Sequence, residues 1–282
     1  MSDKIRLDRR RAIRNTLAGS SALLLGAAGL PRTAWASAPV FTRNGMAAAP
    51  GMGAPALIET NGVTLGVYDQ SVGLPVVLCH GFPELAYSWR HQMQALSGAG
   101  YRAIAPDQRG YGLSDRPQGM EHYTIRHLCD DLAGMLDALD IEKAVFCGHD
   151  WGGGVVWMMP RLHPDRVAGV IGVNTPGFHP AHPRDNSESP IVRTENYYTV
   201  TFQKPGHADA LLAADVRRTF ESMLRRGGFW DAARFPTLPE DSAERQVDLL
   251  RMLAQGDFAG EFILTEAEAQ VFVQPVCARV LR

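Results

Sequence analysis

Short, continuous apolar runs alternate with stretches of helical spacing over residues 57–173. The strand-length runs lie at 57–60, 63–68, 75–79, 102–105, 144–147 and 167–173. Between them, residues 84–99, 124–139 and 153–162 carry apolar side chains at helical spacing. Asn61-Gly62 predicts that the first two runs pair antiparallel. Apolar strands that alternate with helices are typical of a mostly parallel sheet with helices on both faces. We therefore predict an α/β core over residues 57–176.

The pattern changes after Asn174. Residues 177–273 contain no apolar run of strand length, but they include helical stretches at 208–224 and 243–253. This predicts a helical cap over residues 177–273, inserted on the core. Residues 274–282 match no element that we expect next, and we interpret them as an aberrant tail.

The first 38 residues resemble an export signal. Six basic residues precede an apolar run at 17–30, and a cleavage site of the small-x-small type follows within 34–38. The basic residues are Lys4, Arg6, Arg9, Arg10, Arg11 and Arg14. This order predicts a cleavable signal, of twin-arginine type although Ala12 stands where that motif prefers Phe. The protein would then be periplasmic or secreted, would keep no stable membrane anchor after cleavage, and would begin with a flexible lead-in over residues 39–56. The alternative is a disordered basic tail beside a hydrophobic anchor.

Composition excludes several partners and cofactors. The chain has 282 residues, 45% of them hydrophobic, and a net charge of −2, which gives no reason to expect a nucleic acid or an anionic membrane. Four cysteines, Cys79, Cys129, Cys147 and Cys277, show no CxxC spacing. Because two of them lie inside apolar runs, we expect buried thiols, with a disulfide framework as the alternative. No metal-ligand spacing is present, so we predict neither a metal nor a cofactor.

The central chemical signal is the segment Gly148-His149-Asp150-Trp151-Gly152, where a strand meets a helix. A turn this tight needs small residues on both sides of its middle residue, and it exposes that residue at the carboxyl edge of the sheet. The middle residue here is Asp150. A carboxylate at this position can attack a carbon that bears a leaving group or belongs to a strained ring. The alternative is that Asp150 only caps the following helix.

A second signal, His80-Gly81-Phe82-Pro83-Glu84, follows the 75–79 strand. With a nucleophile at the strand–helix turn, one oxyanion-hole amide comes from the residue after it and one from this earlier loop. These would be the backbone N–H groups of Trp151 and Phe82. Pro83 would fix the loop, in the cis form if the turn requires it. Residues 107–114, Asp-Gln-Arg-Gly-Tyr-Gly-Leu-Ser, are given a scaffolding role.

These motifs resemble the soluble epoxide hydrolases of the α/β-hydrolase fold. The similar segments are HGFPE at 80–84, DQRGYGLSDRP at 107–117, GHDWGG at 148–153 and FQKPG at 202–206. Haloalkane dehalogenases share the GHDWGG turn, but they usually carry a halide-binding Asn where this chain has Phe82. Tyr198 lies where the epoxide hydrolases keep a cap tyrosine, with Tyr197 as an adjacent alternative. The resemblance implies a pocket lined by Phe82, Pro83, Trp151, Tyr197 and Tyr198.

The resemblance also implies a two-step reaction. Asp150 would attack a small apolar epoxide while Tyr198 and a second cap tyrosine hold the ring oxygen, which gives an alkyl ester on the enzyme. Water activated by a histidine and an acid would then hydrolyse the ester to a diol, with the oxyanion held by Phe82 and Trp151.

The histidine and the acid that follow the nucleophile in this fold have no counterpart in the sequence. His163, His179, His182 and His207 follow Asp150, but none comes after a late core strand. The strand end at Val173-Asn174-Thr175 carries no carboxylate. We therefore predict a truncated or frameshifted reading frame that lacks the last core strands and is deficient in turnover. The alternatives are a shortened paralogue, a haloalkane dehalogenase-like hydrolase and a non-catalytic binder of apolar ligands.

Overall fold

The computed structural model describes residues 49–177, 194–226, 237–256 and 258–273, which all belong to one compact unit. The predicted export signal, residues 39–48 of the predicted lead-in and the tail at 274–282 lie outside the described residues. None of the described helices is both long enough and apolar enough to cross a membrane.

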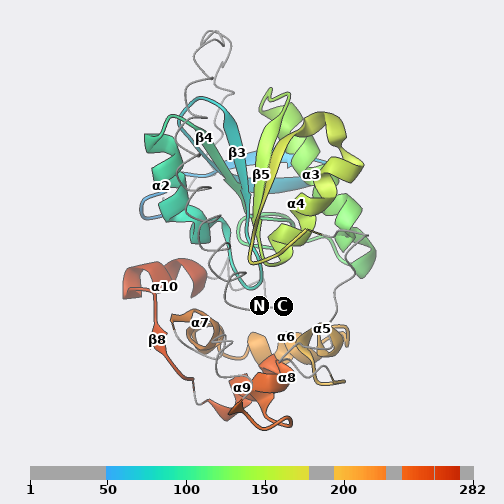
Figure 1. Ribbon diagram of the computed structural model, residues 1–282, viewed down its shortest axis with the longest axis vertical. Coiled ribbons are helices and arrows are strands. Elements are labelled where there is room, and N and C mark those ends of the chain that lie inside the picture. Colours follow the sequence, from blue (N-terminus) through green and yellow to red (C-terminus); the bar gives the residue numbers. More distant parts are fainter. Residues whose placement is uncertain (1–48, 178–193, 227–236, 257, 274–282) are drawn as a thin grey trace, which may run out of the picture. The chain divides into compact units, whose positions relative to one another are not determined.

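A six-stranded, mostly parallel sheet forms the core, as predicted (Figure 1). Its strands are β1 (Ala56–Thr60), β2 (Val63–Gln70), β3 (Pro75–Cys79), β4 (Arg102–Pro106), β5 (Ala144–His149) and β6 (Val167–Val173). Their order across the sheet is β1-β2-β4-β3-β5-β6. The last four strands run parallel, whereas β1 pairs antiparallel with β2, and β2 pairs antiparallel with β4. The carboxyl ends of β3, β5 and β6 therefore meet at one edge of the sheet.

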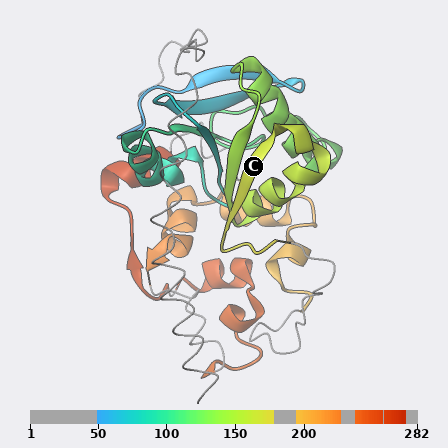
Figure 2. The same cartoon turned by 45° about the horizontal axis from the view of Figure 1, so that its top comes forward.

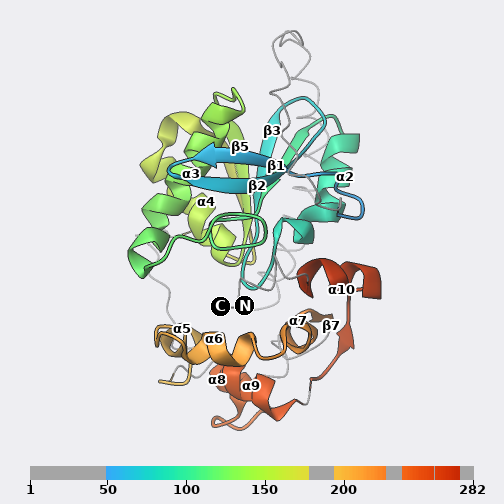
Figure 3. The same cartoon turned by 180° about the vertical axis from the view of Figure 1, so that it is seen from behind.

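Helices cover both faces of this sheet (Figures 1 and 3). They are η2 (Ala86–Trp89), α2 (Arg90–Gly98), η3 (Met120–Tyr123), α3 (Ile125–Ala138) and α4 (Trp151–Leu162). Alternate residues of a strand point to opposite faces. On β3, Val77 and Cys79 pack in the cluster formed with α3 and α4, whereas Val76 and Leu78 pack in the cluster that contains Met93 of α2.

The predicted core elements are present, with two shifts in their ends. Strand β5 continues to His149 and α4 begins at Trp151, so Asp150 alone separates them. The helix predicted over 84–99 is instead a short 3-10 turn followed by α2 from Arg90. The backbone N–H of Glu84 bonds to the carbonyl of Gly81 in a local turn, and the backbone N–H of Ala86 donates to Asp107 at 2.8 Å, a tertiary contact that holds this segment as a loop before the helix starts.

At the other end of the sheet, β6 (yellow in Figure 2) lies beside β5, and it is an edge strand within the described part of the chain. Its outer residues are apolar but poorly covered, since Ile171 is 49% exposed and Val173 is 36% exposed. No charged side chain interrupts the seven residues of this strand. An apolar edge of this kind favours pairing with another strand.

The second half of the chain is mainly helical, as predicted for the cap. Its elements are α5 (Tyr198–Thr201), α6 (His207–Leu212), α7 (Val216–Met223), β7 (Arg225–Arg226), α8 (Ala243–Gln246), α9 (Leu249–Gln255), β8 (Glu261–Phe262) and α10 (Glu266–Val273). The two long helices predicted at 208–224 and 243–253 are each broken in two. Asp215 and Asp248 cause the breaks, because each side chain accepts a hydrogen bond from the third residue of a new helix and so starts it.

Helices α7 and α10 are fastened to the core by aromatic packing. Phe272 of α10 contacts both Tyr87 of η2 and Phe220 of α7, with ring centroids 5.8 and 5.1 Å apart. The guanidinium of Arg90 bonds to Glu268 at 2.8 Å. The two phenylalanine side chains are almost completely buried. This part of the predicted cap therefore shares a hydrophobic cluster with the α2 face of the sheet.

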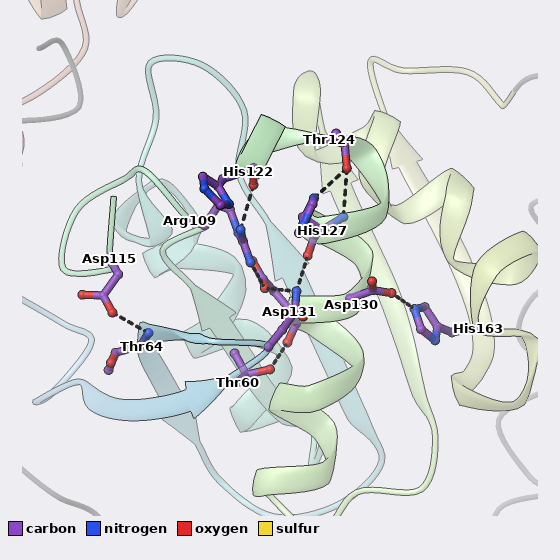
Figure 4. A network of polar contacts seen from close by, with 11 residues as sticks. Thr60, Thr64, Arg109, Asp115, His122, Thr124, His127, Asp130, Asp131 and His163 are labelled. Atoms are coloured by element: carbon purple, nitrogen blue, oxygen red, sulfur yellow. Dashed lines mark hydrogen bonds and ion pairs between the residues drawn. The ribbon is translucent and has the colours of Figure 1, made fainter. Parts of the chain in front are cut away.

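A buried polar network ties β1, α3 and the loop after β4 together (Figure 4). Arg109 donates two hydrogen bonds to Asp131, at 2.7 and 2.6 Å, and a third to the carbonyl of His122 at 2.7 Å. Thr60 donates to the main-chain carbonyl of Asp131 at 3.0 Å. These contacts support the scaffolding role predicted for residues 107–114.

The last residues of the predicted lead-in differ from the prediction. Residues 49–55 are not a loose segment, because Ala49 and Met52 are buried in the same cluster as Trp89 and Met93. The carbonyl of Met52 accepts a hydrogen bond from Gln70 at 3.0 Å. The Gly- and Ala-rich sequence concealed this, because two small or flexible apolar residues suffice to anchor a short segment.

Candidate active site

Asp150 occupies the sharp turn between β5 and α4 that the sequence predicts. Its φ of 52° and ψ of −121° are unusual for a residue with a side chain. The turn is tight enough that a Cβ on Gly152 would collide with the carbonyl oxygens of Cys79 and His80. Although Asp150 stands at the N-cap position of α4, its side chain makes no capping hydrogen bond. The interpretation of Asp150 as a mere helix cap is therefore wrong.

The loop after β3 approaches this carboxylate from the neighbouring strand end. The backbone N–H of Phe82 donates to Oδ1 of Asp150 at 3.1 Å. Gly81 is required beside it, since a Cβ there would come within 2.5 Å of the Asp150 Cβ. The Phe82–Pro83 peptide bond is cis. The two elements predicted to form an oxyanion hole are thus in contact at Asp150.

Two other polar residues of these motifs support the loops. His80 is fully buried, and Gln108 bonds to it through its backbone N–H, at 3.0 Å, and through its side-chain amide. Burial lowers the pKa of His80, which keeps the imidazole neutral so that it accepts this backbone hydrogen bond. Asp107 accepts hydrogen bonds from the backbone N–H groups of Ala86 and Leu113, at 2.8 and 2.9 Å.

A pocket of about 580 Å³ lies over the Asp150 carboxylate. Core and cap residues both line it: Phe82, Pro83, Glu84, His149, Asp150, Trp151, Asn174, Tyr198, Met223, Leu224 and Leu249. A volume of this size suits a small organic ligand, and most of the walls are apolar. The structure therefore brings together all of the predicted site residues except Tyr197.

The two adjacent tyrosines differ in their access to the pocket. Tyr198 lines the pocket, and its ring packs against Phe202 at 5.7 Å. Tyr197 is not among the lining residues, although its ring lies 5.0 Å from that of Tyr198 and both rings pack against Val247 and Leu249. Of the two cap tyrosines weighed from the sequence, Tyr198 is the one with access to the pocket.

The sequence reasoning missed a histidine–carboxylate pair in the pocket. Nδ1 of His149 donates to Glu84 at 2.9 Å, and the same carboxylate accepts the backbone N–H of Gly81 at 2.9 Å. The hydrogen bond to Glu84 raises the pKa of His149. Burial opposes ionisation of Glu84, but its hydrogen bond and charge interaction with His149 outweigh this, and the pKa of Glu84 is lowered. The signal was available, because both residues belong to motifs at adjacent strand ends.

Two of the histidines that follow Asp150 in the sequence lie away from the pocket lining. His163 pairs with Asp130 of α3 at 2.7 Å on the surface of the core (Figure 4). His207 is the first residue of α6. His179 and His182 lie outside the described residues. Among the residues that the structure describes, His149 is the histidine that lines the pocket.

The segment after β6 also reaches Asp150. Asn174 lines the pocket with its amide nitrogen 3.4 Å from Nε2 of His149. Thr175 donates its hydroxyl to the main-chain carbonyl of Asp150 at 2.9 Å. Three neighbouring strand ends therefore supply the polar part of the site.

The cysteines are not part of this site. Cys79, Cys129 and Cys147 are buried free thiols, as predicted for them, and Cys277 lies outside the described residues. Burial raises the pKa of Cys129 to about 12. A search of the described residues finds no group of three or more histidine, cysteine or acidic side chains placed to hold a metal ion.

Similarity to known proteins points to one family. The family model of the alpha/beta hydrolase fold matches residues 75–236. The chain is 51% identical over 178 residues to Epoxide hydrolase A of Mycobacterium tuberculosis, which covers 61% of this chain and 55% of that protein. It is 35% identical over 219 residues to Epoxide hydrolase 1 of Siraitia grosvenorii, covering 73% of this chain and 69% of that protein. The chain thus spans about half the length of the Mycobacterium tuberculosis relative.

Solved structures agree in fold. A crystal structure of Epoxide Hydrolase A from Mycobacterium thermoresistibile is 36% identical with a TM-score of 0.52, over 80% of this chain and 76% of that one. An epoxide hydrolase from an endophytic Streptomyces is 32% identical with a TM-score of 0.62, over 80% of this chain and 70% of that one.

Proposed function

Because this chain belongs to the epoxide hydrolases of the α/β-hydrolase fold, as its motifs predict, we propose that Asp150 opens an epoxide and becomes an alkyl ester. One observation carries this proposal. The Asp150 carboxylate leaves its own helix uncapped and is held by the Phe82 N–H at 3.1 Å in a pocket that Tyr198 also lines.

The hydrogen bond from Phe82 assigns different roles to the two carboxylate oxygens. Oδ1 accepts the Phe82 N–H, so Oδ2 is the oxygen that attacks the epoxide carbon. The carbon–oxygen bond of the ring then breaks, and the ring oxygen takes up the electron pair and the phenolic proton of Tyr198, which Tyr198 regains from solvent. The product is an Asp150 ester with a neighbouring hydroxyl group. Its carbonyl oxygen is Oδ1, which is already at the Phe82 amide.

Hydrolysis of the ester requires a second step. Water adds to the ester carbon, and the negative charge develops on Oδ1, where the amides of Phe82 and Trp151 stabilise it. The Cγ–Oδ2 bond then breaks, so Oδ2 leaves as a hydroxyl of the vicinal diol with the proton taken from water, and the oxygen of that water completes the Asp150 carboxylate. A base must take the proton of the attacking water.

The supply of this base limits turnover in our proposal. His149 lines the pocket, but its Nδ1 bonds to Glu84 at 2.9 Å and its Nε2 bonds to the amide group of Asn174 at 3.4 Å. With both ring nitrogens engaged, the imidazole has no free nitrogen to take the proton of the attacking water. We therefore propose that the ester forms readily and is hydrolysed slowly.

The walls of the pocket favour an apolar substrate. Phe82 and Trp151 come from the core side, and Met223, Leu224 and Leu249 come from the helical half of the chain. Transfer of an apolar substituent from water to such walls is favourable. An aryl epoxide such as styrene oxide meets both requirements, with an apolar body and a strained carbon–oxygen ring.

Intact mass spectrometry after incubation with styrene oxide tests the proposal. We expect one epoxide mass to be added per chain, and peptide mapping should place it on Asp150. Steady release of the diol would contradict slow turnover but would leave the assignment of Asp150 as the nucleophile intact. Absence of both adduct and diol would overturn the function, and release of chloride from a chloroalkane would favour the dehalogenase alternative.

We also propose that residues 1–38 direct export through a twin-arginine route. The support is the run of arginines before a short apolar stretch and a small-residue cleavage site. In a bacterial host, Arg9→Lys with Arg10→Lys should retain the protein inside the cell. Equal export of the variant and the parent chain would contradict this route.

A further inference from the structure

Asp150 is held in a backbone conformation that needs external support. With φ at 52° and ψ at −121°, it lies where residues with a side chain are rare. Such residues are destabilised by roughly 1–3 kcal/mol and persist only when several contacts fix them. The helix provides two of these contacts, from the amides of Gly153 and Gly154 to the Asp150 carbonyl at 3.0 and 3.3 Å.

A third contact comes from the segment that follows β6. Asn174 has a positive φ of 57°, and this turn directs the next residue back toward α4. The hydroxyl of Thr175 donates to the Asp150 carbonyl at 2.9 Å. The carbonyl of Thr175 in turn accepts the indole N–H of Trp157, a residue of α4, at 2.7 Å. Thr175 is therefore anchored at both its side chain and its backbone.

We infer that Thr175 is a positioning residue for the nucleophile. It does not line the pocket, and it acts on Asp150 through the main-chain carbonyl. Without its hydroxyl, the carbonyl keeps only the two amide donors at the start of α4, and the turn can relax. Relaxation moves the carboxylate relative to the Phe82 amide. The inference rests on the proposed function, because it concerns the rate at which Asp150 attacks an epoxide.

The effect on rate follows from the geometry of attack. The reacting oxygen and carbon must be held close together and in line, and a displacement of about 1 Å can slow a reaction by about a hundredfold. Loss of one of several supports should displace the carboxylate by less than that. We therefore expect a decrease of about tenfold in the rate of ester formation.

The central experiment compares Thr175→Val with Thr175→Ser. Valine has nearly the same shape and no hydroxyl, whereas serine retains the donor. The rate of adduct formation with styrene oxide is followed by intact mass as a function of epoxide concentration. We expect about tenfold slower ester formation at saturation for Thr175→Val, an unchanged concentration for half saturation, and a rate within about twofold of the parent for Thr175→Ser.

Thr60→Val is the matched control. Thr60 is another threonine whose hydroxyl donates to a main-chain carbonyl, that of Asp131 at 3.0 Å, but it is buried in the polar network of the core. Both valine variants lose one hydrogen bond of this type. If Thr175→Val is slowed no more than Thr60→Val, or if Thr175→Ser is slowed as much as Thr175→Val, Thr175 has no positioning role.

Amide hydrogen exchange separates this inference from the proposed function. The exchange of the Gly153 and Gly154 amides reports the stability of the turn and needs no epoxide. We expect faster exchange there in Thr175→Val than in Thr60→Val or Thr175→Ser. If the parent chain forms no adduct, the proposed function fails, and unchanged exchange at these two amides would overturn the positioning role.

Discussion

Asp131 and Asp150 show how the same side chain becomes either a structural or a reactive group. Asp131 is 3% exposed, and both of its carboxylate oxygens accept hydrogen bonds from Arg109. Asp150 accepts one main-chain N–H, from Phe82, on Oδ1 and faces a pocket. Asp131 has no oxygen left for chemistry, whereas Asp150 lines the pocket and, in the function that we propose, its Oδ2 attacks the substrate.

The difference arises from where each residue stands in its element. Asp131 lies inside α3, where the helix backbone is regular and the side chain is free to satisfy Arg109. Asp150 is the single residue between β5 and α4, and the strained backbone fixes its side chain beside the Phe82 loop. A buried charge that is fully paired stabilises the fold, and one held by few donors remains available to react.

The largest expected effect is that of Asp150→Asn. An amide is a poor nucleophile, so we expect adduct formation with styrene oxide to fall by at least about a thousandfold. The shape of the side chain is kept, so the midpoint of urea unfolding should move little. Intact mass and a urea titration check both parts. A variant that still gains one epoxide mass at the parent rate, mapped to a residue other than 150, would show that the nucleophile lies elsewhere.

Asp131→Ala should have the opposite effects, a loss of stability with adduct formation retained. Removal of one partner of a buried ion pair leaves Arg109 unpaired, and we expect a loss of about 3–5 kcal/mol in the free energy of unfolding. The protein that remains folded should still form the adduct on Asp150. Urea unfolding measures the loss of stability.

Asp137→Ala provides the control for that loss. Asp137 pairs with Arg166 at 2.7 Å, but its side chain is 66% exposed, so we expect a change within about 1 kcal/mol. Equal losses in Asp131→Ala and Asp137→Ala would mean that the buried pair does not stabilise the core in the way we describe.

Tyr198→Phe tests the hydrogen-bond donor that we propose for the oxygen of the opening epoxide ring. Without the phenol, the opening ring oxygen loses a hydrogen bond as its charge grows, and we expect adduct formation to slow by about a hundredfold. Tyr197→Phe should slow it by less than about threefold, because Tyr197 is not among the residues that line the pocket. Single-turnover mass measurements on both variants decide between them. A larger effect from Tyr197→Phe would reverse the assignment.

The smallest effect concerns the pH dependence of stability at the Glu84–His149 pair. The raised pKa of His149 stabilises the fold fully below the unfolded value of 6.5, and this contribution is lost as pH rises through the folded pKa. The lowered pKa of Glu84 stabilises the fold above the unfolded value of 4.5, and this contribution is lost as pH falls through the folded pKa. Both contributions are present together between pH 4.5 and 6.5.

Glu84→Gln removes the charged partner and so measures this window. Between pH 4.5 and 6.5, we expect the free energy of unfolding of the parent to exceed that of the variant by about 1 kcal/mol, after allowance for the partial exposure of His149. The difference should narrow above and below the window. Urea unfolding of both proteins at several pH values gives the curve, and a constant difference across all of them would argue against the pair.

The sequence by itself determined the core sheet and the turn that carries Asp150. Apolar runs of strand length and helical spacing are local properties, so the order of β1 to β6 along the chain and the position of α4 follow from them. The strand–helix turn at Asp150 and the HGFPE loop also have local sequence signals, because each requires a glycine beside one specific residue. The breaks at Asp215 and Asp248 had a local signal too, since each aspartate caps a new helix.

Only the tertiary structure decided which side chains share the site. It placed Tyr198 but not Tyr197 in the pocket lining, paired His149 with Glu84, and placed Thr175 on the Asp150 carbonyl. Residues 49–55 were packed for the same reason, by contacts with distant residues. Hydrophobic periodicity specifies which face of an element is buried, but the partner on that face comes from another part of the chain. Contacts between strand ends are therefore set by the order of strands in the sheet, which no local pattern encodes.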